Sequence, residues 1–419
     1  MSQQAKLVRE NRTIVVDFTD EATYFSSLGQ RKVFVEFVLA FILSIGLQLK
    51  HKKDCQAGSC LTRHSHYVRA RLNGLPIWRV QCTTCKAVFT VLPHFVLRYR
   101  AMKPEVAKQA LLATHGGLSL ELCAVLCNVS PMALYRLVCA FGRQSLVTVL
   151  TRCGLPLPPY FLADEKHSHC LAAKVYLPTI VCGRLIWHLG YTEDKSAQAF
   201  EDSYDAFRQA ALGHDPTYQV RGMLTDGFES TRKSLGRLFP KARIGSCWLH
   251  AVMKLPSKLT SVSSTLRQAL THQFATVLFR SRQRASLRVF ALGQQLRHFA
   301  KTVTTEAGAG NGSRVRQWFQ EKKAGWYTLL EDTKMPRTTT LLDQAHNALD
   351  RKLYMMKGFH HPEGQQKAFL NGLALLYDLI PYQRRAKHAG RCGVQVEGGT
   401  LPTSDWFLNL CILTAGGLQ

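Results

Sequence analysis

The sequence predicts an α/β protein in which a mixed sheet carries a helical insertion, preceded by a cysteine-rich hairpin module and a helical domain. Three observations support this fold class. Apolar strand-like runs alternate with amphipathic helices between residues 158 and 250, two cysteine pairs flank a hairpin-like segment, and helical apolar periodicity spans residues 103–145. We divide the chain into a helical N-terminal segment, the cysteine-rich module, the helical domain, the α/β domain with its insertion, and a tail: 1–50, 51–100, 101–154, 155–390 (insertion about 255–335) and 391–419.

The chain of 419 residues is strongly basic. It carries 54 lysines and arginines against 28 aspartates and glutamates, which gives a formal net charge of +26. A surplus of this size is typical of proteins that bind polyanions, and double-stranded DNA is the partner that we expect. Hydrophobic residues make up 46% of the chain, which excludes wholesale disorder.

The amino-terminal sequence MSQQAKLVRENRT is polar and has no signal-peptide pattern. We therefore expect a reducing, cytoplasmic environment, in which clustered cysteines serve as metal ligands and scattered cysteines as small core residues. The apolar run Val33–Leu49 contains Glu36 and is of marginal length for a membrane span. It predicts a buried helix and no membrane association.

Two cysteine pairs predict a structural zinc site of the zinc-ribbon type. Cys55 and Cys60 form the first pair, and Cys82 and Cys85 form the second, within RVQCTTCKAVFTVLP. The turn Asn73-Gly74 lies between them, as expected for a hairpin that separates two knuckles. Four thiolates of this kind hold one tetrahedral Zn²⁺. Four unrelated core cysteines are the alternative.

The first half of this module has the looser pattern, so His64 or His66 could replace one of its cysteines as a ligand. Basic side chains occur throughout the module and its C-terminal flank, and they make DNA contact plausible there. These residues are Arg69, Arg71, Arg79, Arg98 and Arg100.

The segment from 103 to 145 has the pattern of a helix-turn-helix. After the helix PEVAKQALLATH, Ser119 caps a short helix, and Ser130-Pro131 begins a third helix behind a tight turn. We expect the third helix to enter the major groove of DNA. The expected apolar positions of the short helix are Leu122, Val125 and Leu126, and the exposed face of the third helix is Met132, Tyr135, Arg136 and Arg143. An ordinary helical hairpin within a larger core is the alternative.

After the stiff break LPLPP, the pattern changes to strands and helices. YFLADEKH, AKVYLPTIVC and RLIWHLGYT read as an antiparallel meander, followed by a helix capped by Ser196, the strand VRGMLTDG, the helix FESTRKSLGRLF and the strand ARIGSCWLH. Two of these strands end in an acid, Asp164 and Asp226. The carboxyl ends of strands are where an open α/β sheet collects its ligands. Each aspartate taken alone also fits a surface turn.

The blocks FLADEKHSH, MLTDGFES…LGRLFPKARIGSCWLH and TTTLLDQAHNALDRKL resemble those of DDE-type transposases, closest to bacterial insertion-sequence and mutator-like members. The resemblance covers most of the chain and includes a Cys-x2-His block, here Cys247 and His250. It implies an RNase H-like catalytic domain behind a zinc ribbon and a helix-turn-helix. It also implies binding of element ends, cleavage and strand transfer by a homo-oligomer, and a place at the bacterial nucleoid.

Such chemistry uses two divalent ions, Mg²⁺ or Mn²⁺, about 4 Å apart and held by carboxylates. Asp164 and Asp226 fit as the first two ligands. The family places a glutamate in the first turn of a later helix, often with an asparagine three residues on. This chain offers Asp343, Gln344 and Asn347 there, so we expect Asp343 to be the third ligand, with Asp350 as the alternative.

Several neighbouring polar residues receive supporting roles. Alternation along the strand predicts that Glu165 points away from Asp164, with His167 and His169 as adjacent polar groups. Cys247 and His250 are expected to pack beside the acids and form hydrogen bonds, because two ligands alone rarely hold a metal. Basic residues on or after the last helix suit either DNA phosphates or a solvated face: Lys352, Lys357, Arg384, Arg385 and Lys387.

Two other functions remain open from the sequence. A transposase-derived regulator would bind DNA after losing a catalytic ligand. A structure-specific nuclease on the same fold would share the metal site and lack strand transfer.

Overall fold

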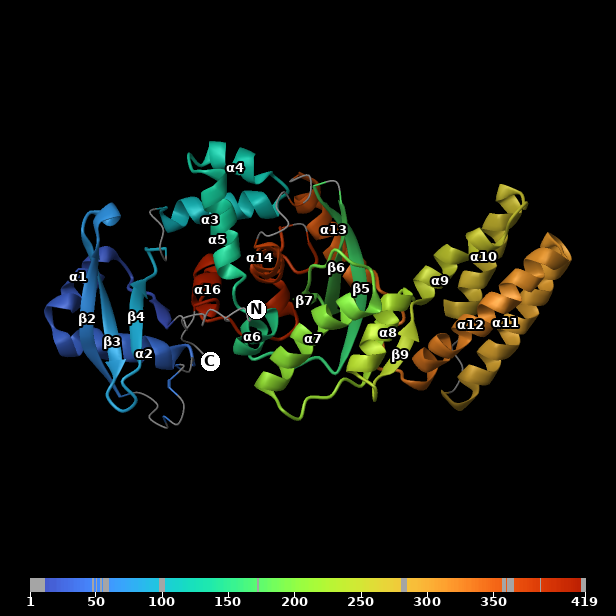
Figure 1. The fold of residues 1–419 in the computed structure, drawn as a ribbon, viewed down its shortest axis with the longest axis horizontal. Coiled ribbons are helices and arrows are strands. Elements are labelled where there is room, and N and C mark those ends of the chain that lie inside the picture. The colour runs from blue at the N-terminus through green and yellow to red at the C-terminus, as the bar shows by residue number, and fades with distance from the viewer. Residues whose placement is uncertain are drawn as a thin grey trace, which may run out of the picture. The chain divides into compact units, whose positions relative to one another are not determined.

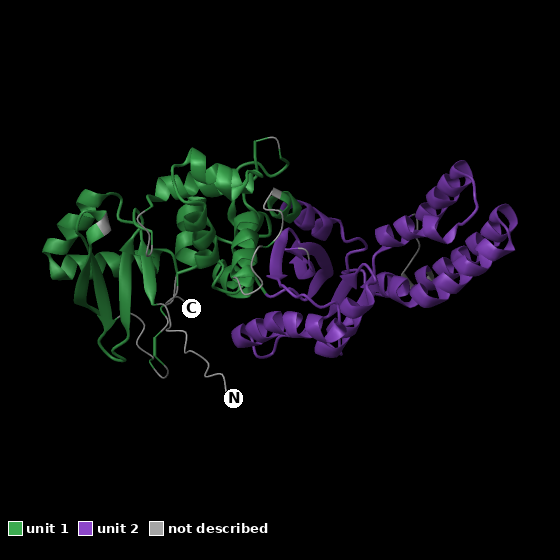
Figure 2. Cartoon of the chain, turned by 45° about the horizontal axis from the view of Figure 1, so that its top comes forward, with its two compact units in different colours: residues 1–156, 349–419 green, residues 157–348 purple. Residues whose placement is uncertain are grey.

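The computed structural model describes residues 12–46, 49, 51–52, 55, 60–97, 102–171, 173–279, 285–355, 359, 365–384 and 386–415. The chain forms two compact units (Figure 2). Unit 1 consists of Met1–Pro156 together with Leu349–Gln419, and unit 2 is Leu157–Ala348. Unit 2 is thus inserted, in sequence, between the two parts of unit 1.

The N-terminal part of unit 1 is a four-stranded sheet in the order β1-β4-β3-β2 (Figure 1). β2 and β3 form the predicted antiparallel hairpin, and Asn73 and Gly74 both have the positive φ angles of its turn. β1 pairs in parallel with β4, so the segment 1–50 contributes a strand as well as helices to this sheet. The elements are β1 Thr13–Val16, α1 Glu21–Gly29, α2 Arg31–Ser44, β2 Leu61–Arg69, η1 Ala70–Leu72, β3 Leu75–Cys82 and β4 Val88–Pro93.

The helices α1 and α2 share an aromatic core with this sheet. Phe18, Tyr24, Phe34 and Phe89 are fully buried, and the Tyr24 hydroxyl donates to the Pro76 carbonyl at 2.6 Å. The apolar run predicted as a buried helix forms α2, which ends at Ser44 and buries one face. Among the described residues, no single helix is long and apolar enough to cross a membrane, and one pair bent by 114°, α4 with α5, passes the same test of length and composition.

The rest of unit 1 is helical. It contains α3 Pro104–His115, α4 Leu120–Leu126, α5 Pro131–Phe141, α6 Leu146–Arg152, α14 Gln366–Leu379, α15 Gly393–Val396 and α16 Trp406–Leu413. The predicted cap is present, because Ser119 Oγ accepts from the Leu122 amide at 3.1 Å. The end of α5 lies directly on α14: a Cβ on Gly142 would lie 1.8 Å from the Ala368 carbonyl oxygen.

Unit 2 contains a five-stranded mixed sheet in the order β7-β6-β5-β8-β9. β5, β6 and β7 are antiparallel, as the meander predicted, and β8 and β9 run parallel to β5. The elements are β5 Tyr160–Cys170, β6 Ala173–Cys182, β7 Leu185–Leu189, α7 Ala197–His214, β8 Gly222–Thr225, α8 Glu229–Leu238 and β9 Arg243–Ser246. Ser196 caps α7 through the Ala199 amide at 3.2 Å, as predicted.

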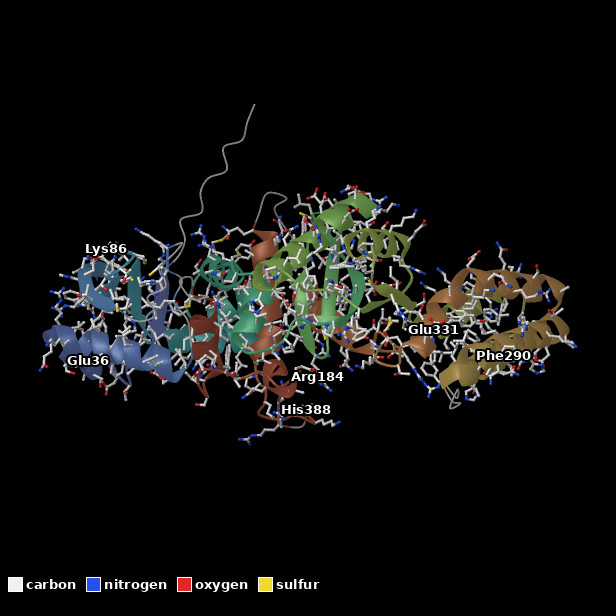
Figure 3. All side chains as sticks on the ribbon, turned by 90° about the horizontal axis from the view of Figure 1, so that it is seen from below. Glu36, Lys86, Arg184, Phe290, Glu331 and His388 are labelled. Atoms are coloured by element: carbon white, nitrogen blue, oxygen red, sulfur yellow. The ribbon has the colours of Figure 1, made fainter. Side chains whose placement is uncertain are left out.

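A helical insertion follows β9, shown in yellow and orange in Figure 1. It comprises α9 Trp248–Lys254, η2 Leu255–Lys258, α10 Ser264–Phe279, α11 Ala285–Ala307 and α12 Ala309–Glu331. Aromatic rings fill its interior, with Phe274 stacked on Phe319 at 5.4 Å. On its outside, Phe290 of α11 is 62% exposed (Figure 3). The next helix, α13 Thr340–Met355, begins in unit 2 and ends in unit 1.

Candidate functional site

Three carboxylates meet in unit 2 at the point where β8 ends beside the middle of β5. Asp164, Glu165 and Asp226 each offer an oxygen, and these atoms all lie within 4.8 Å of one another. The parallel pairing of β5 with β8 places Ala163 opposite Thr225, so Asp164 and Asp226 follow the last paired residues of adjacent strands. The sequence predicted that both aspartates end their strands; this is correct for Asp226, but Asp164 lies within β5, which continues to Cys170. We call these three residues the acidic cluster.

Glu165 belongs to the acidic cluster. The prediction that its side chain points away from Asp164, and therefore away from the site, is wrong. β8 ends at Thr225, which leaves the edge of β5 beyond Ala163 without a partner strand on that side. The Glu165 amide there donates to Asp164 Oδ1 at 2.9 Å. A side chain from either face of β5 can reach such a gap, so strand alternation does not separate the two carboxylates.

Burial and mutual repulsion disfavour the ionised forms of the carboxyl groups in the acidic cluster. Burial, followed by the charges of Asp226 and Glu165, raises the pKa of Asp164 well above its ordinary value. Burial and then the charge of Asp226 raise the pKa of Glu165 to about 7, although its carboxylate accepts from Thr231 Oγ1 at 2.9 Å. Lys254 Nζ lies 3.5 Å from Asp226 Oδ2, and His167 Nε2 lies 3.9 Å from Glu165 Oε1. A bound divalent cation would relieve this repulsion, and three carboxylates supply the hard oxygen ligands that Mg²⁺ prefers.

Asp343 lies in the first turn of α13 but outside the acidic cluster. Its carboxylate accepts from Thr339 Oγ1 at 3.4 Å, and the same hydroxyl is 3.1 Å from His250 Nδ1. The structure therefore links the predicted third acid to the Cys-x2-His block and does not place it with the other ligands. Asp350, the alternative, falls in the part of α13 that belongs to unit 1.

Cys247 and His250 form the predicted hydrogen bonds, but on a helix and not on a strand. The predicted strand ARIGSCWLH ends at Ser246, and Cys247 caps α9 by accepting from the His250 amide at 3.5 Å. The hydrogen bond from Cys247 is the largest influence that raises the pKa of His250; burial opposes it, and the charges of Asp226 and Asp164 add to it. Among the described residues, the pair does not join any group of three or more possible metal ligands.

A buried histidine holds α13 against β6, the strand that pairs with β5 at Asp164. His346 Nε2 lies 3.1 Å from Thr179 Oγ1, and Thr179 pairs with Asp164 across β5 and β6. Burial, and next Lys166, lower the pKa of His346 to about 3, so this imidazole is neutral. His346 was not recognised from the sequence. Its position one turn after Asp343 on an apolar face was the available signal.

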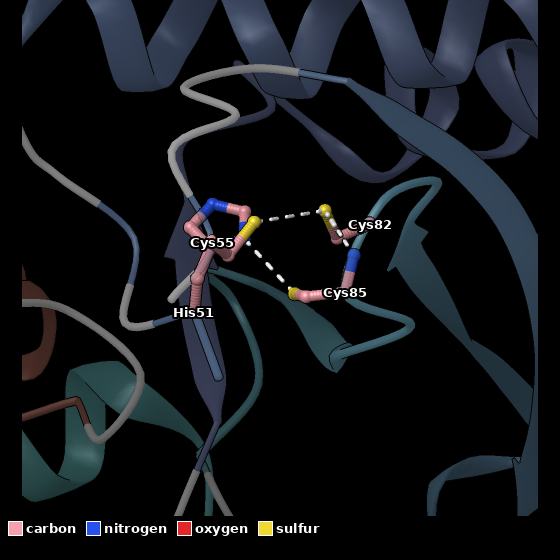
Figure 4. Close-up of side chains that lie close together, drawn as sticks. All are labelled: His51, Cys55, Cys82 and Cys85. Atoms are coloured by element: carbon pink, nitrogen blue, oxygen red, sulfur yellow. Dashed lines mark hydrogen bonds between the residues drawn. The ribbon is translucent and has the colours of Figure 1, made fainter. Parts of the chain in front are cut away.

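A second candidate metal site lies in unit 1 and consists of His51, Cys55, Cys82 and Cys85 (Figure 4). His51 Nδ1 is 3.4 Å from Cys85 Sγ and 3.6 Å from Cys55 Sγ, and the sulfurs of Cys55 and Cys82 are 3.9 Å apart. A tetrahedral Zn²⁺ with ordinary bond lengths separates its ligands by about 3.6 Å for nitrogen and sulfur and about 3.8 Å for two sulfurs. The arrangement therefore fits zinc without further movement.

The donor chemistry agrees with this fit. Burial opposes ionisation of Cys85, but hydrogen bonds, led by those of the Lys52 backbone and the His51 side chain, outweigh it and lower the pKa of Cys85 to about 6. A thiolate near neutral pH is the form that binds a metal. The Cys85 amide donates to Cys82 Sγ at 3.5 Å, as expected for a knuckle that holds its first thiolate with a backbone amide.

The predicted ligand Cys60 is not in this site. Its side chain is exposed, and its carbonyl oxygen accepts from the Thr83 amide at 2.9 Å, so its backbone supports the knuckle while its thiol stays outside. His64 and His66, the expected replacements, also lie outside the cluster; the His66 ring packs on Trp78. His51 takes the fourth position. The spacing His51-x3-Cys55 was the signal that sequence reasoning missed.

Among the described residues predicted to contact DNA, only some are exposed and free of contacts within the protein that would occupy them. Arg136 and Arg143 are exposed, whereas Arg69 donates to the Leu97 carbonyl at 2.8 Å and Tyr135 stacks on Phe369 at 4.9 Å. The Arg71 side chain, together with Arg98, Arg100, Lys357 and Arg385, lies outside the described residues.

Lys352 contradicts its predicted role as a DNA contact. Its side chain is only 3% exposed, and its Nζ lies 3.3 Å from His115 Nδ1 within unit 1. Burial lowers the pKa of Lys352 to about 8, and Asp378, which is fully buried, opposes that change. Lys352 is a core residue of the helical part of unit 1.

The predicted buried face of α4 is also wrong. Leu122, Val125 and Leu126 are 44%, 76% and 66% exposed. The helix instead buries Leu120, Cys123 and Ala124, which share the opposite face at the spacing i, i+3, i+4.

No protein-family model matches the chain, and no curated protein matches it significantly.

Proposed function

We propose that this protein is a DNA transposase whose unit 2 catalyses metal-dependent phosphodiester hydrolysis and strand transfer. The observation that carries the proposal is the meeting of Asp164, Glu165 and Asp226 where β8 ends beside its parallel neighbour β5. Three antiparallel strands followed by two parallel ones is the order that the resemblance to RNase H-like transposases implies. The net charge of +26 suits a DNA substrate.

The acidic cluster would hold the divalent ions. When bound, such ions lower the pKa of an attacking water and stabilise charge on the reacting phosphate. Asp164 and Asp226 are the first ligands of this proposal, and Glu165 is the third carboxylate nearest to them. His346, bound to Thr179, keeps α13 next to β6, and Thr339 joins Asp343 to His250 beside the cluster.

Unit 1 would bind DNA. The site of His51, Cys55, Cys82 and Cys85 would hold a structural zinc ion that joins the end of β3 to the chain before β2. In the helix-turn-helix proposal, Arg136 of α5 and Arg143, just beyond the end of α5, contact DNA.

The test is cleavage of a labelled DNA duplex that carries the flanking ends of the protein's own element, with Mg²⁺ or Mn²⁺. Asp226→Asn removes a proposed ligand with little change of volume, and Asp202→Asn, at an exposed position of α7, is the matched control. We expect wild type and the control to cut and Asp226→Asn to bind without cutting. Parallel assays of Glu165→Gln and Asp343→Asn identify the third acid.

Other outcomes assign other functions. Binding of the duplex by wild type with no cleavage under either metal refutes the transposase and favours a DNA-binding regulator. Cleavage of branched DNA that does not depend on the element ends favours a nuclease.

A further inference from the structure

Three cations from three different elements lie near the end of β9 and the turn that follows Asp226. They are Arg232 of α8, Lys254 at the end of α9, and Lys322 of α12. Lys254 Nζ donates to the Asp226 carbonyl oxygen at 3.3 Å, and Lys322 Nζ lies 3.6 Å from where a Cβ on Gly227 would be. We call these three residues the basic triad.

Gly227 permits this approach. Its φ angle of +101° is one that glycine adopts without strain, and the absence of a side chain leaves the backbone open on the side of Lys322. The close packing of α12 on β9 brings Lys322 there: a Cβ on Gly325 would lie only 2.3 Å from Ser246 Oγ. The same Ser246 hydroxyl accepts from Arg232 Nη1 at 3.4 Å.

The charges of the triad are poorly balanced by protein groups. Arg232 and Lys322 are half-buried, yet among the described residues neither has a carboxylate within 4.0 Å. The nearby Glu229 is paired with Lys233 at 2.6 Å, and Lys254 shares Asp226 with the acidic cluster. Burial, followed by the charges of Arg232 and Lys254, lowers the pKa of Lys322, and the charges of Glu321 and Asp226 oppose this change.

We propose that the basic triad binds a backbone phosphate of the DNA next to the phosphate at which the acidic cluster acts. The ligand class follows from the geometry, because two amines and a guanidinium converge beside an acidic site, and they match the charge and the several acceptor oxygens of a phosphodiester. The inference rests on the proposed DNA substrate and is independent of whether the DNA is cut.

The test measures binding of a fluorescein-labelled duplex of roughly 30 base pairs by anisotropy, in EDTA, between about 50 and 200 mM KCl. The variants are Lys322→Gln and Arg232→Gln in the full chain. Lys323→Gln is the matched control, because it removes the same charge from the next position of α12, where the ammonium donates to Gln320. Thermal melting of each variant verifies folding.

Loss of one phosphate contact makes the negative slope of log K against log salt less steep by about 0.9. If a variant and wild type bind equally at 1 M salt, this difference makes the variant bind roughly eightfold more weakly than wild type at 0.1 M salt. We expect this change for Lys322→Gln and Arg232→Gln and not for Lys323→Gln. Equal slopes for Lys322→Gln and Lys323→Gln, or no binding of the duplex by wild type, overturn the proposal.

The two proposals fail in different ways. If the variants give the expected slopes but wild type never cleaves DNA, the phosphate site at the basic triad is supported and the transposase activity is refuted. If wild type cleaves DNA with Mg²⁺ but Lys322→Gln binds like Lys323→Gln, the transposase activity is supported and the phosphate site is refuted.

Discussion

Replacing Glu165 by glutamine should stabilise the metal-free protein at pH 8. The Glu165 side chain is only 6% exposed and shares a small volume with two other carboxylates. Glutamine keeps an oxygen that can accept from Thr231, so the change removes charge with little loss of packing. The stabilisation therefore reports the repulsion inside the acidic cluster.

The magnitude follows from the pKa. Folding raises the pKa of Glu165 from 4.5 to about 7, and each pKa unit corresponds to about 1.4 kcal/mol, so ionising this group costs the fold about 3 kcal/mol at pH 8. The folded state binds more protons than the unfolded state between these pKa values. Wild-type stability therefore falls as the pH rises through this range, and the variant lacks that loss. At pH 5 the expected difference is under about 1 kcal/mol.

Urea unfolding in EDTA, followed by tryptophan fluorescence at pH 5 and pH 8, measures this difference. Four of the six tryptophans lie in unit 2, so the signal reports mainly on the unit that carries the site. Glu331→Gln, at an exposed position of α12 (Figure 3), is the matched control and should change neither value by more than about 0.5 kcal/mol.

Addition of Mg²⁺ should then make wild type more stable than Glu165→Gln. A ligand that binds the native state stabilises it in proportion to its affinity, and wild type has one more carboxylate for the ion. The reasoning is refuted if Glu165→Gln is no more stable than wild type at pH 8 in EDTA, or if its advantage is the same at pH 5.

Two further predictions concern unit 1. Cys85→Ser should lose zinc, measured by atomic absorption of the purified protein, whereas Cys60→Ser should retain it; equal zinc content in both variants would contradict the site of Figure 4. Gly142→Ala should lower stability by about 1–3 kcal/mol or more in urea unfolding, because its Cβ would collide with the α14 backbone. Gly213→Ala, which meets nothing within 4 Å near the end of α7, should be neutral or stabilising, and a similar loss in both variants would argue against that collision.

Much of unit 2 could be predicted because its signals are local. The strand and helix order from Tyr160 to Ser246 follows from apolar runs and from the turn residues between them. The rule for carboxyl ends of strands correctly predicted that Asp164 and Asp226 lie together, although β5 continues past Asp164 to Cys170. Glu165 was missed because alternation gives the face from which a side chain leaves the strand and not what that side chain can reach, and β5 outlasts β8 on the side of Asp226. That length difference is a tertiary property, which no local pattern contains.

In unit 1 the errors have a similar origin. Cysteine pairs suggested the zinc ligands, but proximity in space selected His51 over Cys60. α4 is only seven residues long, so two apolar faces compete and the pattern alone does not decide which one is buried. Lys352 reads as a surface charge in the sequence and is buried because α13 continues into unit 1.

The insertion of unit 2 between the two parts of unit 1 affects how the protein is made. On the ribosome, unit 2 is complete before any residue of Leu349–Gln419 has been added. At ~5–20 residues per second, the nascent chain waits several seconds for the segment that supplies α14 and α16. These helices pack on α5 and β1, so the first 156 residues must remain without their final partners during that time. Translation thus lets the proposed catalytic unit fold first, and the unit proposed to bind DNA completes its core last.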